Sequence, residues 1–185
     1  MTALETSTLE DKLAALASRV ESLEKSAGND RLALGVMSGN LDTTMAAFII
    51  GLGATAYDIQ VDMFFTFWAI AALRDPKKTA RKGLLDRMFG LMLPRGAGAL
   101  PLSKLQMAGV GPKMIRAVMQ KRGVKPLEAL IKDAGELGIR IHICEMSMNV
   151  MGFKPQEMID YPNLDYVGVA TFIKLIGEAK QAFFL

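Results

Sequence analysis

Two hydrophobic patterns follow one another along the chain: a heptad-like spacing in the first 30 residues, then alternating apolar runs and amphipathic stretches. The first pattern is carried by residues four and three positions apart, namely Leu9, Leu13, Leu16, Val20 and Leu23. It stops at Ser26-Ala27-Gly28-Asn29, so we expect a helical arm over residues 1–30. A seam of this length is marginal as a free coiled coil. The arm therefore either docks on its own domain or joins copies of the chain.

From Arg31 to Leu185 the pattern predicts strands that alternate with helices. The predicted strands are Leu32–Met37, Ile59–Thr66, Ile139–Cys144 and Ala182–Leu185. The predicted helices are Leu41–Ala56, Trp68–Leu73, Pro76–Leu93, two helices with Pro112 and Pro126 in their first turns, and Gly168–Lys180. Such alternation implies a mainly parallel sheet with helices on both faces. We therefore predict one α/β domain over residues 31–185.

Composition narrows the class of protein. Hydrophobic residues make up 51% of the chain and charged residues 22%, which is a globular composition. The longest uncharged stretch of the apolar first half, Thr43–Tyr57, is too short and too glycine-containing to span a bilayer. The first 30 residues are polar, so no secretory signal is expected in them, and a single cysteine excludes an intramolecular disulfide. We expect a cytoplasmic protein in a reducing environment.

The net charge of +3 hides an uneven distribution. Between Arg74 and Lys125 there are 13 Lys and Arg against two acids, a net charge of +11, whereas the rest of the chain sums to −8. This stretch includes the predicted basic helix Pro76–Leu93 and a Gly- and Pro-rich loop, Pro94–Gly111. It predicts a surface that meets an anionic partner. Phe89 is the one aromatic residue in it, too few for a stacking platform, so nucleic-acid binding is not expected.

Three segments follow predicted strands, and ligands of open parallel sheets bind beyond the carboxyl ends of the strands. These segments are Ser38-Gly39-Asn40, Thr66-Phe67-Trp68 and Cys144-Glu145-Met146-Ser147-Met148. Cys144 is the strong nucleophile among them, and backbone N–H groups at the start of a following helix or turn would favour its thiolate. Lone cysteines are also often small buried hydrophobes. Position alone leaves both interpretations of Cys144 open.

Other chemistry finds less support in the sequence. His142 is the one histidine, but residues i and i+2 of a strand lie about 6.5–7 Å apart, too far for a Cys–His hydrogen bond. One histidine and one cysteine do not make a zinc site. The methionines near Cys144 suit an apolar lining better than a copper site. No phosphate-binding or dinucleotide motif is present, so neither a metal nor a cofactor is expected.

The residues around Cys144 resemble a family signature. The run Cys144–Gly152 is similar to the C-x-M-S-M-x-x-M-G signature of the DsrE/DsrF-like sulfurtransferase and sulfur-carrier family. Three further runs resemble that family in the same order: Phe64–Trp68, Met92–Gly96 and Tyr166–Thr171. The resemblance covers Arg31 to Leu185 and leaves the N-terminal arm outside.

The resemblance implies a three-layer α/β/α sandwich that forms homo-oligomers. It also implies a sulfur carrier or sulfurtransferase of sulfur relay or sulfur oxidation, which holds sulfane sulfur on Cys144 as a persulfide or thiosulfonate adduct. Relatives often carry a further cysteine, and this chain has none. A two-cysteine relay is therefore not expected, nor is a peroxidase, because the chain has no second thiol to resolve a sulfenic acid.

Such a carrier would exchange sulfur with sulfur-carrier proteins or rhodanese-type donors, or take it from anionic compounds such as thiosulfate. The residues expected to line its pocket are Ser38, Gly39, Asn40, Thr66, Trp68 and Ser147. Arg95, Lys104 and Lys113 are expected to steer anions to Cys144. The alternative is a non-catalytic module in which the arm and the basic helix hold a sulfur-metabolism complex together or at a membrane surface. In that case Cys144 would be inert.

Overall fold

A five-stranded, all-parallel sheet organises the domain, in the order β4-β3-β2-β1-β5. The structure is a computed structural model that describes residues 3–26 and 29–185. Its strands are β1 (Asn29–Val36), β2 (Gln60–Phe65), β3 (Arg140–Cys144), β4 (Leu164–Val167) and β5 (Ala179–Phe184). The three central strands are almost entirely buried, as expected for strands covered on both faces.

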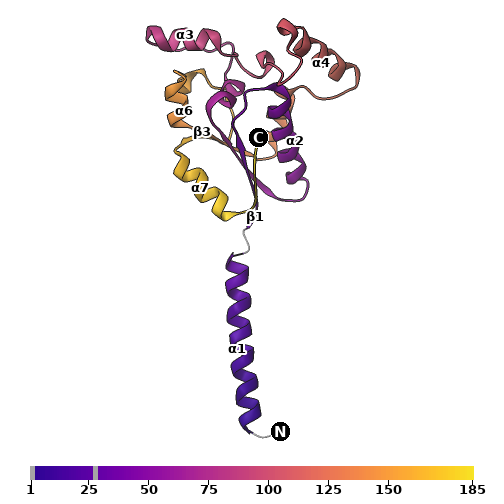
Figure 1. The fold of residues 1–185 in the computed structure, drawn as a ribbon, viewed down its shortest axis with the longest axis vertical. Helices are drawn as coiled ribbons and strands as arrows, with labels where there is room; N and C mark the ends of the chain where they lie inside the picture. Colours follow the sequence, from indigo (N-terminus) through magenta and orange to yellow (C-terminus); the bar gives the residue numbers. More distant parts are fainter. Residues whose placement is uncertain (1–2, 27–28) are drawn as a thin grey trace.

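Helices cover both faces of this sheet. The helices α2 (Leu41–Thr55) and α5 (Leu127–Glu136) pack together on one face, and α7 (Val169–Glu178) lies against β1 and β5 on the other (Figure 1). The predicted three-layer α/β/α sandwich with an N-terminal helical arm is therefore confirmed.

The remaining elements gather beyond the carboxyl ends of the strands, at the top of Figure 1. The helical segments there are η1 (Phe67–Leu73), α3 (Leu84–Met92), α4 (Val110–Lys121) and α6 (Glu145–Val150). Three short turns complete the chain: η2 (Ala97–Ala99), η3 (Met107–Gly109) and η4 (Pro155–Glu157). This is the end of the sheet at which sequence reasoning placed the ligand site.

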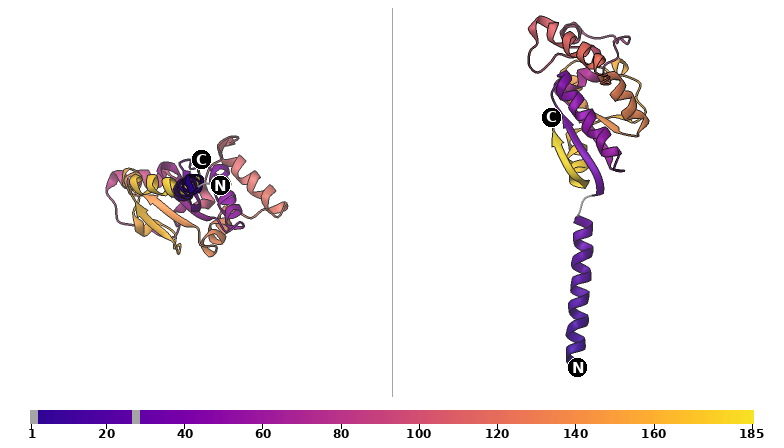
Figure 2. Two further views of the ribbon diagram at one scale, coloured as in Figure 1. Left: turned by 90° about the horizontal axis from the view of Figure 1, so that it is seen from below. Right: turned by 90° about the vertical axis from the view of Figure 1, so that its right-hand side faces the viewer.

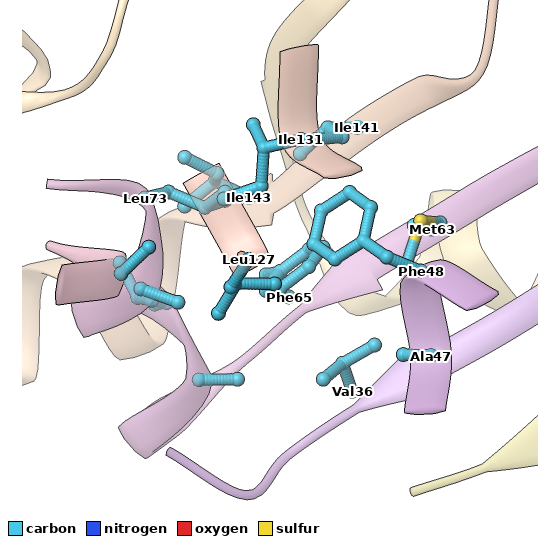
Figure 3. Packing of buried hydrophobic residues seen from close by; sticks show 14 of the residues in the cluster. Val36, Ala47, Phe48, Met63, Phe65, Leu73, Leu127, Ile131, Ile141 and Ile143 are labelled. Atoms are coloured by element: carbon cyan, nitrogen blue, oxygen red, sulfur yellow. The ribbon is translucent and has the colours of Figure 1, made fainter. Parts of the chain in front are cut away.

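The main core fills the space between the sheet and the helices α2 and α5 (Figure 3). The Phe48 ring of α2 lies 5.9 Å, centroid to centroid, from the Phe65 ring of β2. Ile141 and Ile143 of β3 approach the same cluster, to which α5 adds Leu127. Burial of these large side chains fixes the three central strands and so holds their carboxyl ends in register.

The helix α1 (Ala3–Ser26) projects away from the domain in Figure 1 and in the right-hand view of Figure 2. Its heptad positions Leu9, Leu13, Leu16 and Val20 are 51–65% exposed. The side chain of Leu23, like residues 27–28, lies outside the described residues. Over residues 9–22 no side chain of α1 is buried, so this part of the helix does not dock on its own domain. No helix in the described ranges is long and apolar enough to cross a membrane.

One predicted helix was too long. Only Leu84–Met92 of the predicted Pro76–Leu93 helix is helical, and Pro76–Gly83 is irregular. The reason is tertiary: the Lys77 N–H bonds the Asp75 carboxylate, and Lys78 Nζ donates to the Met158 carbonyl and to Asp160. These contacts hold the segment against the turn η4 instead of in a helix.

Smaller differences concern boundaries. The short strand β4 was not predicted, β1 begins at Asn29, and β5 begins at Ala179 because α7 ends at Glu178. Pro126 lies at the N-cap of α5, whereas Pro112 lies in the first turn of α4 as predicted. The expected loop Pro94–Gly111 contains the turns η2 and η3, and α4 already begins at Val110.

Candidate functional site

Cys144 is the last residue of β3 and directly precedes α6. Its side chain is 2% exposed and lies on the α7 side of the sheet with Ala33, Phe64 and Phe172. The Phe64 and Phe172 rings stack at a centroid distance of 4.4 Å and close this small cluster. Strand alternation explains the placement: the neighbouring Ile143 points into the main core on the opposite face.

Two hydroxyl groups connect the ends of β2 and β3 at this cysteine. Ser147, fully buried in α6, donates a hydrogen bond to Cys144 Sγ over 3.4 Å. The Thr66 and Ser147 hydroxyl oxygens lie 2.7 Å apart, and Thr66 is the donor when the Ser147 proton points to sulfur. Cys144, Thr66 and Ser147, all named from the sequence, thus meet in one hydrogen-bonded chain.

The surroundings favour the thiolate of Cys144. Burial alone raises the pKa of the thiol. The Ser147 hydroxyl and N–H, the Thr66 hydroxyl and the Met146 N–H stabilise the charged sulfur, and together they outweigh burial. The pKa of Cys144 therefore lies below its usual value, which increases the nucleophilic fraction at neutral pH.

The backbone is strained beside this cluster. Phe67, which follows Thr66, adopts a left-handed conformation with φ of 46°, uncommon for a bulky side chain. The side chain of Phe67 is 41% exposed, and that of the neighbouring Trp68 is 55% exposed. The turn thus directs two aromatic rings towards solvent while the Thr66 hydroxyl stays inside.

An ionic network centred on the buried Asp62 and His142 lies next to the cysteine on the same face of the sheet. His142 Nε2 lies 2.8 Å from Asp62 Oδ1, and its Nδ1 lies 2.5 Å from Asp165 Oδ1. Arg140 donates two hydrogen bonds of 2.7 Å to Asp62, and Arg31 lies 3.7 Å from the same carboxylate. No Cys144–His142 hydrogen bond is formed among the described contacts, so His142 belongs to this network and not to a Cys–His pair.

This network perturbs two pKa values in opposite directions. Burial lowers the pKa of His142, but its bonds to Asp62 and Asp165 and their charges outweigh burial and raise it overall. Burial raises the pKa of Asp62, but donors from His142 and Arg140 outweigh it and hold the pKa below its usual value. The geometry thus favours an ionised Asp62 against a protonated His142.

The side chains near Cys144 also determine whether a metal ion could be held there. Within the described residues, no three His, Cys, Asp or Glu side chains converge in a way that could hold a metal ion. Met148, Met151 and Met158 are buried in the main core, while Met146 is 56% exposed. The methionines therefore do not form one thioether cluster at the cysteine.

A separate groove of about 530 Å³ collects the other predicted pocket residues, and Cys144 is not among those that line it. Ser38, Gly39, Asn40 and Trp68 line it together with Met37, Leu93, Pro94, Pro101 and Leu185. A Cβ at Gly39 would lie 2.6 Å from the Trp68 carbonyl oxygen, so only glycine allows these segments to approach so closely. Thr66 and Trp68 thus belong to neighbouring but distinct environments.

The three predicted steering cations are dispersed. Arg95 lines another cavity with Arg74 and Lys82. Lys113 lies on α4, on the other side of α2 from α6 (Figure 1), and Lys104 lies in the loop whose Ser103 bonds Asp42 of α2. The structure therefore does not bring Lys113 to the cysteine.

Sequence reasoning missed the ionic cluster around Glu157. Arg74, 4% exposed, pairs with Glu157, and the Lys82 ammonium contacts the same carboxylate. Arg74 directly follows the apolar run Ala69–Leu73, and Asp62 interrupts another apolar run. A charged residue next to or inside an apolar run, such as Arg74 or Asp62, was the feature of the sequence that could have indicated a buried ion pair.

Comparison with known proteins supplies a family and two relatives. A profile described as the DsrE/DsrF/DrsH-like family matches residues 28–184. The uncharacterized protein YrkE of Bacillus subtilis (strain 168) is 42% identical over 156 residues, which cover 84% of this chain and 96% of YrkE. The sulfur carrier protein DsrE2 of Allochromatium vinosum is 26% identical over 159 residues, covering 84% and 98%. The crystal structure of the ychN protein from E. coli aligns with a TM-score of 0.48 and 7% identity, over 84% of this chain and 98% of that one.

Proposed function

The chain belongs to the DsrE/DsrF/DrsH-like family, and from this premise we propose that it carries sulfane sulfur on Cys144. The observation that carries the proposal is the hydrogen-bonded chain Thr66–Ser147–Cys144, which favours a thiolate at a strand end. The similarity to a protein named as a sulfur carrier supports a role in sulfur metabolism.

The chemistry requires no cofactor. The Cys144 thiolate attacks the outer sulfur of thiosulfate, the S–S bond breaks, and sulfite leaves with its electron pair. The product is a Cys144 persulfide anion. A persulfidated donor protein reacts in the same way and leaves as its thiolate, whereas tetrathionate would give a thiosulfonate adduct and release thiosulfate. Transfer to an acceptor reverses the step, with the Cys144 thiolate as leaving group.

Burial sets a condition on this exchange. At 2% exposure, the sulfur can meet a donor only when the covering side chains move aside. The exposed Phe67 and Met146 follow Thr66 and Cys144 closely in the chain and offer apolar contacts to a donor protein. A buried adduct is in turn shielded from solvent thiols between transfers.

The single cysteine makes the test direct. Incubation with polysulfide, thiosulfate or a persulfidated carrier should add sulfur mass to the intact protein, and dithiothreitol should remove it. Cys144→Ser is the control and should stay unlabelled. Equal labelling of the variant, or a wild-type protein that never labels, would refute the carrier function.

The cellular setting completes this proposal. A free thiolate suits a reducing compartment, so we place the carrier in the cytoplasm, where rhodanese-type donors and sulfur-carrier proteins would exchange sulfur with it.

We also propose that residues 1–30 act as an assembly arm and residues 31–185 as the sulfur-binding domain. The exposed heptad positions of α1 support assembly into a homo-oligomer. Light scattering of the full chain and of a chain starting at residue 29 tests the arm.

A docking module is the second candidate, and the surface of α3 favours it. Leu84, Leu91 and Met92 are 68–85% exposed beside the basic segment 77–87, at the end of the molecule opposite α1 (Figure 1). An exposed apolar helix flanked by lysine and arginine suits an anionic membrane surface. Co-sedimentation with anionic but not zwitterionic vesicles, lost in a Leu84→Gln/Leu91→Gln variant, would support this candidate. Equal recovery with and without anionic vesicles would contradict it.

A further inference from the structure

A cavity of about 410 Å³ lies between the segment that follows η1, the helix α3 and the turn η4. The charged side chains that line it are Arg74, Arg81, Lys82, Arg87, Arg95 and Glu157. Among these described lining residues, Glu157 is the sole carboxylate. The cavity therefore has a strong excess of positive charge, and Cys144 is not one of its lining residues.

The excess extends into the buried part of the wall. Arg74 Nη2 lies 3.5 Å from one oxygen of Glu157, and the Lys82 ammonium contacts the other. Both cationic side chains are no more than 6% exposed, as is Glu157. One carboxylate thus balances only one of two buried cations, and an uncompensated buried charge is costly. The Phe153 ring lies below both cations, 4.6 Å from the Arg74 guanidinium carbon and 5.5 Å from Lys82 Nζ, and compensates them in part.

The two cations differ in how fully they are bonded. Arg74 Nη1 donates to the carbonyls of Gly90, Leu93 and Pro94, which fixes the guanidinium in the wall. The Lys82 ammonium has three donors. Within the described structure its ion pair with Glu157 is the polar contact that it makes, and it forms no hydrogen bond of good geometry. The Lys82 ammonium therefore keeps N–H donors that have no acceptor among the described residues.

Gly90 of α3 packs directly against these groups. A Cβ on Gly90 would lie 3.4 Å from Lys82 Nζ and 3.7 Å from Arg74 Nη2, so the glycine lets α3 approach both cations closely, and both stay buried just behind the cavity wall. Burial lowers the pKa of Arg74 most; Glu157 opposes that shift, and the positive charge of Arg95 lowers the pKa further. Arg95 is thus close enough to repel Arg74, and its side chain is exposed at the mouth of the cavity.

We propose that this cavity binds a divalent tetrahedral oxyanion of the sulfate, thiosulfate or phosphate class. Arg95 supplies donors from its exposed side chain, and the buried charge of Lys82, which Arg74 and Glu157 hold in place, attracts the anion from behind the wall. The bound anion neutralises the charge that Glu157 leaves uncompensated, and charge-assisted hydrogen bonds to oxyanions are among the strongest available. The site is distinct from the cysteine cluster, and its occupation does not depend on the proposed sulfur chemistry.

Calorimetric titration of the full chain with sodium sulfate, thiosulfate and phosphate tests this assignment, at an ionic strength held constant with sodium chloride. We expect saturable binding of at least one anion, weakened roughly tenfold or more in Arg95→Gln and in Lys82→Met. The matched controls Lys104→Gln and Lys113→Gln remove exposed cations elsewhere and should bind like the wild type. The three titrants distinguish a sulfur oxyanion from phosphate as the preferred ligand.

Two results would overturn the proposal: no saturable heat with any of the three anions, or binding by Arg95→Gln at the wild-type affinity. Lys82 is buried, so circular dichroism should first establish that Lys82→Met is folded. Should it not fold, Arg95→Gln still decides, because the exposed Arg95 side chain has no structural partner that the substitution removes among the described contacts.

Discussion

The two faces of the central strands have opposite characters. Towards α2 and α5, β2 and β3 present Met63, Phe65, Ile141 and Ile143, all fully buried in one apolar core. Towards α7, the same strands contribute Asp62 and His142 to the ionic network and Phe64 and Cys144 to the cysteine cluster. Each strand therefore serves packing with one set of alternate residues and chemistry with the other.

The two faces divide apolar packing from chemistry. The apolar face is packed by dispersion and burial, and a polar group buried there without a partner costs stability. The α7 face carries ionisable groups because each of them has partners there: Asp62 has two arginines and a histidine, and Cys144 has two hydroxyl-bearing neighbours. Substitutions on the first face should change unfolding alone, whereas those on the second should change titration or sulfur reactivity as well.

The largest effect is expected for Phe65→Ala on the apolar face. Phe65 is fully buried against Phe48, so truncation leaves a cavity and should lower the free energy of unfolding by about 3–5 kcal/mol. Urea denaturation followed by circular dichroism measures the change. The remaining folded protein should still accept sulfur on Cys144. A variant that is equally stable would show that the core at β2 is less tightly packed than the structure indicates.

Asp62→Asn should have the next largest effect, on the opposite face. The amide cannot neutralise Arg140 and His142, and its NH2 group meets donors, so we expect a loss of about 2–3 kcal/mol. The figure lies below that for a fully buried ion pair because the Arg140 side chain is 40% exposed. Denaturation at several salt concentrations measures it. The matched control is Asp160→Asn, whose carboxylate is 93% exposed and should cost little.

Part of this division could be predicted from the sequence. The apolar runs of β1 and β2 and the alternating isoleucines of β3 predicted these three strands. Strand ends in a parallel sheet meet at one edge, which predicted the proximity of Thr66, Cys144 and Ser147. The strand β4 was missed because Leu164–Val167 is short and includes the exposed Asp165. The Pro76–Gly83 segment was predicted as helix because its lysines and arginines were assigned to the charged side of a helix whose apolar face lies further along, within Leu85–Met92. Its actual conformation depends on Lys78 and Lys82 contacts to Met158 and Glu157, which are distant in sequence.

The pH dependence of stability should reveal the ionic network. Because the folded-state pKa of His142 is raised above its ordinary value of 6.5, its contribution is fully present below that value and is lost as the pH rises through the folded pKa. Unfolding free energies of the wild type should therefore fall with pH above about 6.5, and those of His142→Gln should fall less. Proton NMR can follow the titration directly, since the chain has one histidine. An unshifted His142 titration would mean that Asp62 and Asp165 do not enclose the ring in solution.

The smallest effect on stability, and the most specific one on reactivity, is expected for Ser147→Ala. Ser147 contributes the hydrogen bonds that lower the pKa of Cys144 most, through its hydroxyl and its N–H, and the substitution removes only the first. The pKa of Cys144 should therefore rise, and the fraction of reactive thiolate at neutral pH should fall. The free energy of unfolding should change by only about 1 kcal/mol, because a neutral hydroxyl is lost and Thr66 is left to find another partner.

The rate of alkylation by iodoacetamide between pH 6 and pH 10 measures this effect, because it follows the thiolate. We expect the midpoint of the Ser147→Ala profile to move to higher pH, with the same plateau at high pH. Ser38→Ala is the matched control, since its hydroxyl lines the separate groove and accepts from Asn40. A Ser147→Ala profile that coincides with that of Ser38→Ala would remove the hydroxyl chain from the mechanism and leave the backbone N–H groups of α6 as the support of the thiolate. A lower plateau with an unmoved midpoint would mean that Ser147 governs access to the sulfur and not its charge.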